Sequence, residues 1–279
     1  MRLENEHNKN EDNTGESDMK KWTLVWSDEF EGNTIDLSKW KYDIGNWLVD
    51  QDGNGVKAGW GNSEKQCYTN SPDNAYIKDS KLIIQAKKEQ AEDRFGSYEY
   101  TSAKLKTQGL FSKKYGRFEI KARLPVGKGI WPAIWMMPED NVYGKWPLSG
   151  EIDIVESWGS RPLTVVGTIH YGERPPNNTH TGKELTLPEG NGINAWHVYA
   201  LEWEQGELRW YVDGELYQTQ TEWYSKQSES VENVPYPAPF DQEFHIILNL
   251  AVGGHFDGDP DETTAFPQQF EVDYVRVYE

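Results

Sequence analysis

The sequence predicts an all-β fold, a sandwich or barrel of antiparallel strands, and three features carry that prediction. Short apolar-alternating runs recur between clusters of Gly, Pro, Asn and Asp. The segment Val212-Asp213-Gly214-Glu215 contains the Asp-Gly pair typical of a tight hairpin turn. No stretch indicates a long helix, and no internal repeat is present. Many short strands separated by turns are typical of antiparallel sandwiches and barrels.

The expected strands follow one another from the N-terminus. The first, 22–30, ends in the turn-forming run Asp28-Glu29-Phe30-Glu31-Gly32. The strand at 150–157 is unusual because it carries three carboxylates among β-branched residues. The other expected strands, each an apolar run between turn residues, are 74–77, 81–86, 105–110, 116–124, 130–137, 164–171, 196–203, 208–212, 244–251 and 270–278.

The chain is expected to form one domain. Its 279 residues could make two average domains, but all-β sandwiches often reach this length as one. Residues 1–20 are polar, lack the apolar core of a signal peptide, and are expected to be a disordered leader before a single domain at 21–279. The sequence contains no run of about 18 apolar residues, so no membrane-spanning helix is expected. Cys67 is the only cysteine, so an intramolecular disulfide is excluded.

Composition narrows the class of partner. Lys and Arg total 28 and Asp and Glu total 46, which gives a net charge of −18. This charge repels nucleic acid and anionic membranes, whereas a neutral polysaccharide is compatible with it. Thirteen Trp and fifteen Tyr suit surfaces that are both apolar and wet, such as sugar-binding clefts, although core packing also uses such residues. We expect a monomer.

The segment 149–158 is the one around which the chain is organised. Alternate side chains of a strand share a face, so Glu151 and Asp153 point one way. Glu156 would fall on the opposite face of a regular strand. One extra residue, accommodated in a β-bulge near Ile154 and Val155, would return Glu156 to the face of the other two acids. We therefore expect a bulged strand that displays three acids together.

Catalysis is the function that best explains three neighbouring acids. Hydrolysis of a glycosidic bond needs one ionised and one protonated carboxyl group, and burial with neighbouring charge can separate their pKa values. On a straight strand, the Cα atoms of Glu151 and Glu156 would lie about 13 Å apart, so the strand must be concave. A solvated acidic strand edge and a calcium-binding cluster are the alternatives.

The run Glu151 to Glu156, E-I-D-I-V-E after a Gly, resembles the signature of glycoside hydrolase family 16 in its bulged, laminarinase-like form. The resemblance implies a β-jelly-roll of two curved antiparallel sheets with a concave cleft, and a retaining endo-glycanase. Other motifs that carry it are G-W-G-N-S-E (59–64), Y-G-R-F-E (115–119), W-P-A-I-W-M-M-P (131–138), T-I-H (168–170), L-N-L-A-V-G-G (248–254) and V-D-Y-V-R-V-Y (272–278).

The resemblance also implies roles for single residues. Glu151 would be the nucleophile, Glu156 the general acid/base and Asp153 the residue that assists between them. His170 would contact the acids or the sugar. Phe256 stands where family members often have Trp, which leaves that aglycone-side contact in doubt. The implied substrate-binding residues are Asn62, Trp131, Trp135, Trp146, His170, Arg117 and Asn249, with core packing an alternative for Trp131 and Trp135 and a surface charge an alternative for Arg117.

No cofactor is expected for catalysis, but the resemblance implies a structural calcium ion on the convex side. It points to Glu29 and Asp273, with backbone carbonyls completing the site. Ser80 replaces a Gly common in the family in the turn before Lys81, which puts the conformation of that turn in doubt.

The implied function is endo-hydrolysis of internal β-1,3-glucosidic bonds in glucans such as laminarin, outside the cell because the substrate is a polymer. Mixed-linkage β-1,3-1,4-glucan and agarose are alternative substrates. Lichenase-type relatives usually lack the extra residue of the bulge, so Val155 argues against a dedicated lichenase. A non-catalytic β-glucan-binding sandwich and a transglycosylase are the remaining alternatives.

Overall fold

The computed structural model describes residues 21–227 and 232–279, so the leader expected at 1–20 lies outside the described residues. Within them, the chain is almost entirely β, as predicted, with one short 3-10 turn, η1 (Gly59–Gly61), and no α-helix. Strands β5 and β8 pair in parallel, and the other strand pairs of this part run antiparallel.

The outer layer is a ten-stranded sheet. Its order is β17-β16-β15-β10-β19-β7-β8-β5, with β1 paired to β19 and β6 paired to β7. The strands are β1 (Leu24–Asp28), β5 (Gln66–Tyr68), β6 (Ala75–Ile77), β7 (Leu82–Asp93), β8 (Gly96–Ser102), β10 (Gly116–Arg123), β15 (His197–Glu204), β16 (Glu207–Val212), β17 (Glu215–Gln220) and β19 (Gln268–Tyr278).

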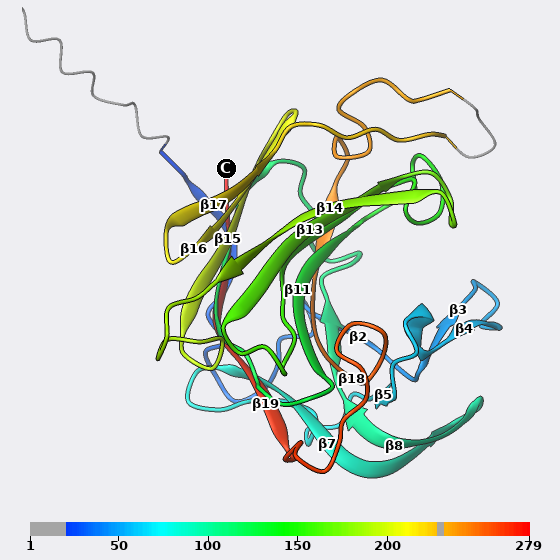
Figure 1. Cartoon of the computed structure of the whole chain (residues 1–279), viewed down its shortest axis with the longest axis vertical. Coiled ribbons are helices and arrows are strands. Elements are labelled where there is room, and N and C mark those ends of the chain that lie inside the picture. The colour runs from blue at the N-terminus through cyan, green and yellow to red at the C-terminus, as the bar shows by residue number, and fades with distance from the viewer. Residues whose placement is uncertain (1–20, 228–231) are drawn as a thin grey trace, which may run out of the picture.

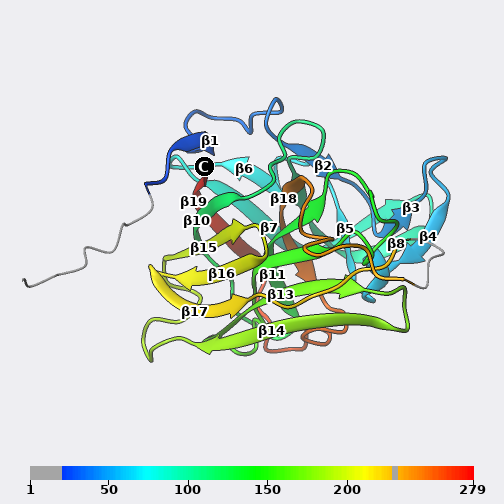
Figure 2. The same ribbon diagram turned by 90° about the horizontal axis from the view of Figure 1, so that it is seen from above.

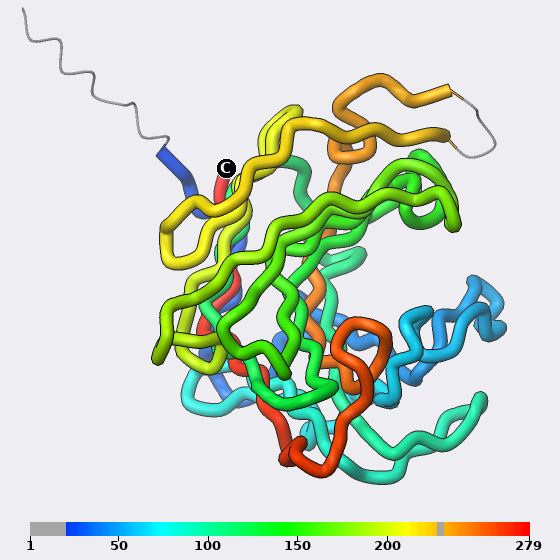
Figure 3. The backbone as a smooth tube through the Cα atoms, viewed as in Figure 1, coloured from blue at the N-terminus to red at the C-terminus, as the bar shows by residue number. Residues whose placement is uncertain are grey.

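The inner layer is a seven-stranded sheet of order β14-β13-β12-β11-β18-β9-β2. Both layers curve in the same sense, and the inner sheet lies within the curve of the outer one (Figure 1; Figure 3). Its strands are β2 (Lys41–Asp43), β9 (Lys104–Lys106), β11 (Ile130–Pro138), β12 (Glu151–Glu156), β13 (Thr164–Gly172), β14 (Asn178–Thr186) and β18 (Phe244–Val252).

A small hairpin of β3 (Trp47–Val49) and β4 (Gly55–Ala58) forms the third sheet. It lies beside β8 at one end of the molecule (Figure 2). The ring of Trp47 stacks on Phe95, at the turn between β7 and β8, with centroids 4.9 Å apart. The hairpin is therefore anchored to the outer sheet by an aromatic contact.

The hydrophobic core lies between the two large sheets. Strand β10 shows the alternation that a sandwich imposes: Phe118 and Ile120 are fully buried, whereas Arg117 and Glu119 point away from the core. Strand β18 is buried along its whole length, because it lies in the middle of the inner sheet. On β10, therefore, alternate side chains face the core, whereas on β18 both faces are covered.

The described chain ends lie side by side. The backbone N–H of Thr23 donates to the carbonyl of Glu279 at 2.8 Å, and the N–H of Glu279 donates back to Thr23 at 2.9 Å. Strand β1 runs antiparallel to the last four residues of β19, beyond the part of β19 that pairs with β7.

Several strands differ from the expectation. The strand expected at 105–110 is only β9, because Thr107 begins a turn in which its carbonyl accepts from Leu110 and Phe111. Strand β14 was not expected, because its sequence is polar and the strand forms the exposed edge of the inner sheet. An edge strand with one partner needs few apolar residues, so it lacks the alternation on which the prediction relied.

Candidate active site

Strand β12 contains the predicted bulge. On the β11 side, consecutive residues pair with Val155 and with Asp153, which leaves Ile154 as the extra residue. The β13 side shows the same shift between Asp153 and Glu156. Ile154 and Val155 are both buried in the core, so the bulge absorbs one apolar residue and keeps Glu156 on the face of Glu151.

The three acids lie in an open groove of about 1150 Å³ along the inner sheet. The groove is formed by side chains of β9, β11, β12, β13, β14 and β18, together with the segment around η1. Of the residues expected to bind substrate, those that line it are Asn62, Trp131, Trp135, Trp146, His170 and Asn249.

Each of the two Glu side chains accepts a hydrogen bond from a different indole. Nε1 of Trp146 donates to Oε2 of Glu151 at 2.6 Å, and Nε1 of Trp131 donates to Oε1 of Glu156 at 3.0 Å. Trp146 comes from the loop before β12, whereas Trp131 comes from the neighbouring strand β11. The two carboxyl groups are thus oriented independently.

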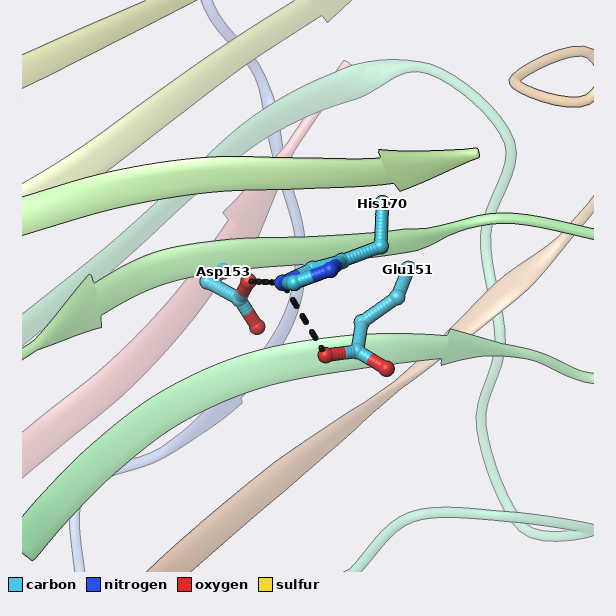
Figure 4. A group of neighbouring side chains, drawn as sticks. All are labelled: Glu151, Asp153 and His170. Carbon is cyan, nitrogen blue, oxygen red and sulfur yellow. Dashed lines mark ion pairs between the residues drawn. The ribbon is translucent and has the colours of Figure 1, made fainter. Parts of the chain in front are cut away.

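His170 lies directly opposite Glu151 in the pairing of β13 with β12. Its Nε2 is 3.3 Å from Oδ2 of Asp153 and 3.8 Å from Oε1 of Glu151 (Figure 4). Burial acts to lower the pKa of His170, but the charges of Glu151, Asp153 and Glu156 outweigh it and raise that pKa to about 10. His170 is therefore a cation that partly neutralises the acids at neutral pH.

The pKa values of Glu151 and Glu156 are both higher than those of ordinary carboxyl groups. Burial, and then the charge of Asp153, raise the pKa of Glu151 to about 7. Burial and Asp153 also raise the pKa of Glu156 well above its usual range, and the charge of Glu151 adds to this. Because ionisation of one acid makes ionisation of the other harder, the site can hold one carboxylate beside one protonated carboxyl group.

The comparisons with known proteins agree with this geometry. The family model described as glycosyl hydrolases family 16 matches residues 62–276. The chain belongs to glycosyl hydrolase family 16. It is 45% identical over 262 residues to the glucan endo-1,3-beta-glucosidase A1 of Niallia circulans, covering 91% of this chain and 37% of that protein. It is also 44% identical to a beta-glucanase of Rhodothermus marinus, covering 92% of this chain and 85% of the relative.

Solved structures of the family show the same architecture. The catalytic domain of the laminarinase from Thermotoga maritima MSB8 superposes with a TM-score of 0.80 at 41% identity, covering 93% of this chain and 99% of that chain. This agreement confirms the predicted β-jelly-roll. As a family 16 glycoside hydrolase, the chain needs no cofactor for catalysis.

A hydrogen-bonded chain of side chains crosses the floor of this family 16 groove. Nε1 of Trp135 donates to Oδ1 of Asn249 at 2.7 Å, and Nδ2 of Asn249 donates to the hydroxyl of Tyr68 at 2.9 Å. That hydroxyl is 3.4 Å from Glu64, which also accepts from Asn62 at 3.1 Å. Three of the expected substrate-binding residues are therefore held by one network.

Tyr68 and Lys104 are two groove residues that the sequence pattern did not indicate. Tyr68 is almost fully buried and links Glu64 to Asn249. The ammonium group of Lys104 lies 4.1 Å from the ring centre of Trp60 and 3.4 Å from Asp43. In sequence, a Lys in the short run Lys-Leu-Lys indicates an exposed charge, and only the packing of β9 beside β18 brings it into the groove.

The expected place of Arg117 in the cleft is wrong. Its guanidinium lies on the outer sheet, 2.9 Å from Glu119 and 2.9 Å from Glu202. The alternation of β10 explains this, because Phe118 and Ile120 face the core and Arg117 must face outward. The surface-charge alternative is the correct one, with Arg117 part of an ion-pair network.

The residues expected to bind calcium lie at a junction of three strands. Strand β7 pairs with β19 up to Val272, β1 pairs with it from Val275, and Asp273 is skipped in the pairing with β10. The end of β1, the start of β7 and a bulge at Asp273 therefore meet. Ser80 keeps a left-handed φ of 52°, so the turn has the conformation that the usual Gly would give.

The carboxylate of Glu29 does not fit the expected ligand role. Both of its oxygens accept hydrogen bonds from Arg276 at 2.9 Å. Asp273 has one oxygen 2.9 Å from Lys121. At this junction the groups that suit a calcium ion are thus the backbone carbonyls and the carboxylate of Asp273, since calcium prefers oxygen ligands. Among the described residues, the cluster of three possible metal-ligating side chains is Glu151, Asp153 and His170, which is the acid centre itself.

Proposed function

We propose that this chain hydrolyses internal β-1,3-glucosidic bonds of β-1,3-glucans with retention of anomeric configuration. The observation that carries the proposal is the bulged strand β12, which places Glu151 and Glu156 in one groove with separate indole donors. Relatives at 40–45% identity whose names specify endo-1,3-glucanase or beta-glucanase activity support this substrate.

The reaction proceeds in two displacements. In the first, ionised Glu151 attacks the anomeric carbon, the glycosidic bond breaks, and Glu156 gives its proton to the departing sugar oxygen. In the second, Glu156 takes a proton from water, whose oxygen attacks the same carbon and releases Glu151. Asp153 and the cationic His170 stay paired during both displacements, and the positive charge of His170 offsets the negative charge of the carboxylates. Two inversions give net retention.

The aromatic side chains of the groove suit a neutral glucan. Trp131, Trp135 and Trp146 line it, and the C–H faces of glucose stack on indole rings. Two lysines line the groove, Lys57 and Lys104; Lys104 is paired with Asp43, and the chain carries a net charge of −18. A sulfated or otherwise anionic polymer would therefore gain little from this groove.

Reducing-sugar assays on laminarin, curdlan, lichenan and agarose test the substrate. We expect a rapid fall in laminarin viscosity and new reducing ends in the β configuration, observed by NMR before mutarotation. Higher activity on lichenan or agarose than on laminarin would replace the proposed substrate, and products in the α configuration would contradict the roles of Glu151 and Glu156.

The variant Glu151→Ala separates hydrolysis from binding alone. We expect it to bind laminari-oligosaccharides in calorimetry with an affinity close to that of the wild type, but to release no reducing sugar. If the wild type also binds without hydrolysis, the chain is a glucan-binding protein. New products longer than the substrate, formed by wild type at high oligosaccharide concentration, would reveal transglycosylation.

We also propose that the chain acts outside the cell and binds one structural calcium ion. A polymeric glucan cannot enter a cell, which supports extracellular action. Finding the activity only inside fractionated cells would contradict it.

The junction at Asp273, with the left-handed turn retained at Ser80, supports calcium bound by Asp273 and by the backbone at Glu29 and Ser80. No helix in the described residues is long and apolar enough to cross a membrane.

A further inference from the structure

Three aromatic rings form a continuous stack on one wall of the groove. The ring of Phe256 lies 4.8 Å from that of Trp131, at an interplanar angle of 15°, and 4.3 Å from that of Trp158, at 7°. Two indoles cannot fit side by side on one face of a phenyl ring at these spacings, so Phe256 lies between them. We call Trp131, Phe256 and Trp158 the aromatic stack.

The outer end of the aromatic stack is also covered. The guanidinium of Arg161 lies 4.4 Å from the ring centre of Trp158 and pairs with Glu184. Arg161 thus presses a planar cation on Trp158, an arrangement that is attractive in itself. With a ring on each side, Phe256 has no face left for a sugar, so it is not the stacking platform that the resemblance suggested.

A buried carboxylate ties together the three backbone segments that carry these rings. Asp257, next to Phe256, accepts from the backbone N–H of Gly129 at 2.9 Å and of Ser160 at 3.1 Å. Gly129 is two residues from Trp131, and Ser160 is two residues from Trp158. Asp257 is only 5% exposed, so these bonds hold the aromatic stack in place from behind.

The other end of the aromatic stack meets the chemistry. Nε1 of Trp131 donates to Oε1 of Glu156 at 3.0 Å, so any rotation of this indole moves the donor off the carboxyl group. We propose that Phe256 is a positioning residue for the acid/base: by filling the space between Trp131 and Trp158, it keeps the Trp131 N–H on Glu156. This inference deepens the proposed function and rests on it.

Loss of Phe256 should affect proton donation by Glu156, which loss of a purely structural residue would not do selectively. If Phe256 orients Glu156, its loss weakens proton donation to the leaving group, and substrates that need that proton suffer most. Laminarin has a poor sugar leaving group. In 2,4-dinitrophenyl β-laminaribioside the leaving group is 2,4-dinitrophenolate, which departs without a proton, and kcat/KM for this substrate reports only the first displacement.

The test compares Phe256→Ala with a matched control, Phe95→Ala. Phe95 also stacks on one indole, that of Trp47, but lies outside the groove lining. For Phe256→Ala we expect kcat/KM on laminarin to fall roughly tenfold or more, a part of the roughly 10²- to 10⁴-fold that general acid–base catalysis contributes, with little change on the dinitrophenyl substrate. Phe256→Trp restores a stacked ring and should recover laminarin hydrolysis. Phe95→Ala should leave the ratio between the two substrates unchanged.

A spectroscopic readout completes the test without turnover. The indole N–H resonance of Trp131, assigned with Trp131→Phe, should exchange faster with solvent in Phe256→Ala than in wild type or Phe95→Ala. Equal losses on both substrates, or unchanged exchange, would overturn the inference. If Phe256→Ala does not fold, Phe256→Leu takes its place. A wild type inactive on laminarin would instead refute the proposed function.

Discussion

At the scale of the residue, the acid centre depends on the balance between its negative carboxylates and one positive imidazolium. Three carboxylates share one cation, His170, whose pKa of about 10 keeps it charged across neutral pH. The positive charge of His170 lowers the pKa of Glu151, which burial and Asp153 raise to about 7. The same cation thus supports the ionised nucleophile without removing the proton from Glu156.

The variant His170→Asn tests this balance. Hydrolysis requires ionised Glu151, so the acid limb of the pH profile of kcat/KM follows its pKa. Loss of the cation raises the pKa of Glu151, and the acid limb should move to higher pH than in wild type. His180→Asn is the control, because His180 lies opposite His170 on β14 but is exposed. A limb that stays in place in His170→Asn would show that the imidazole is not charged.

The sequence could locate the acids but not all of their neighbours. Glu151, Asp153 and Glu156 lie on one strand, where alternation and one extra residue determine the face. Tyr68 and Lys104 come from strands far away in the sequence, and only the pairing of β9 with β18 and the packing of β5 bring them to the groove. Arg117 was misplaced because periodicity shows that side chains alternate, but not which of two sheets holds the strand.

At the scale of the element, the bulge in β12 makes a prediction about single-residue deletions. Removing Ile154 leaves E-I-D-V-E, a regular alternation with all three acids on one face, and β13 already matches that spacing. We therefore expect this deletion variant to fold and hydrolyse laminarin at a measurable rate. Deleting Ile152, an equally buried Ile, keeps the bulge but moves Glu151 to the wrong face, and should abolish activity.

Circular dichroism and thermal melting establish that both deletion variants fold, so that activity can be compared. If both variants fold but are equally inactive, the extra residue does not serve to bring the three acids to one face of the strand.

Strands such as β12 were predictable because they have two partner strands and a buried face. Edge strands such as β14 were not, since solvent satisfies their polar side chains and removes the apolar pattern.

At the scale of the whole molecule, the calcium ion proposed at the Asp273 junction predicts that chelation lowers stability. A ligand at about 100 times its Kd stabilises the folded state by about 2.7 kcal/mol. For a chain of this size, that corresponds to a rise in Tm of roughly 5 °C. We expect EDTA to lower the Tm by that order and added calcium to restore it.

The variant Asp273→Ala should have the lower Tm in both conditions, because it removes the one carboxylate that remains in the proposed calcium site. Laminarin hydrolysis at 25 °C should be unaffected by EDTA, since the groove contains no residue of β1, β7 or β19. A wild-type Tm that is identical with EDTA and with calcium would refute the structural ion.

The pairing of Thr23 with Glu279 has a practical consequence for attaching this enzyme to a support. Both described ends lie side by side on the outer sheet, and neither Thr23 nor Glu279 lines the groove. A tether fused after Glu279 would therefore leave the polymer's path clear. Beads that carry the protein by Glu279 should therefore digest glucan as the free protein does.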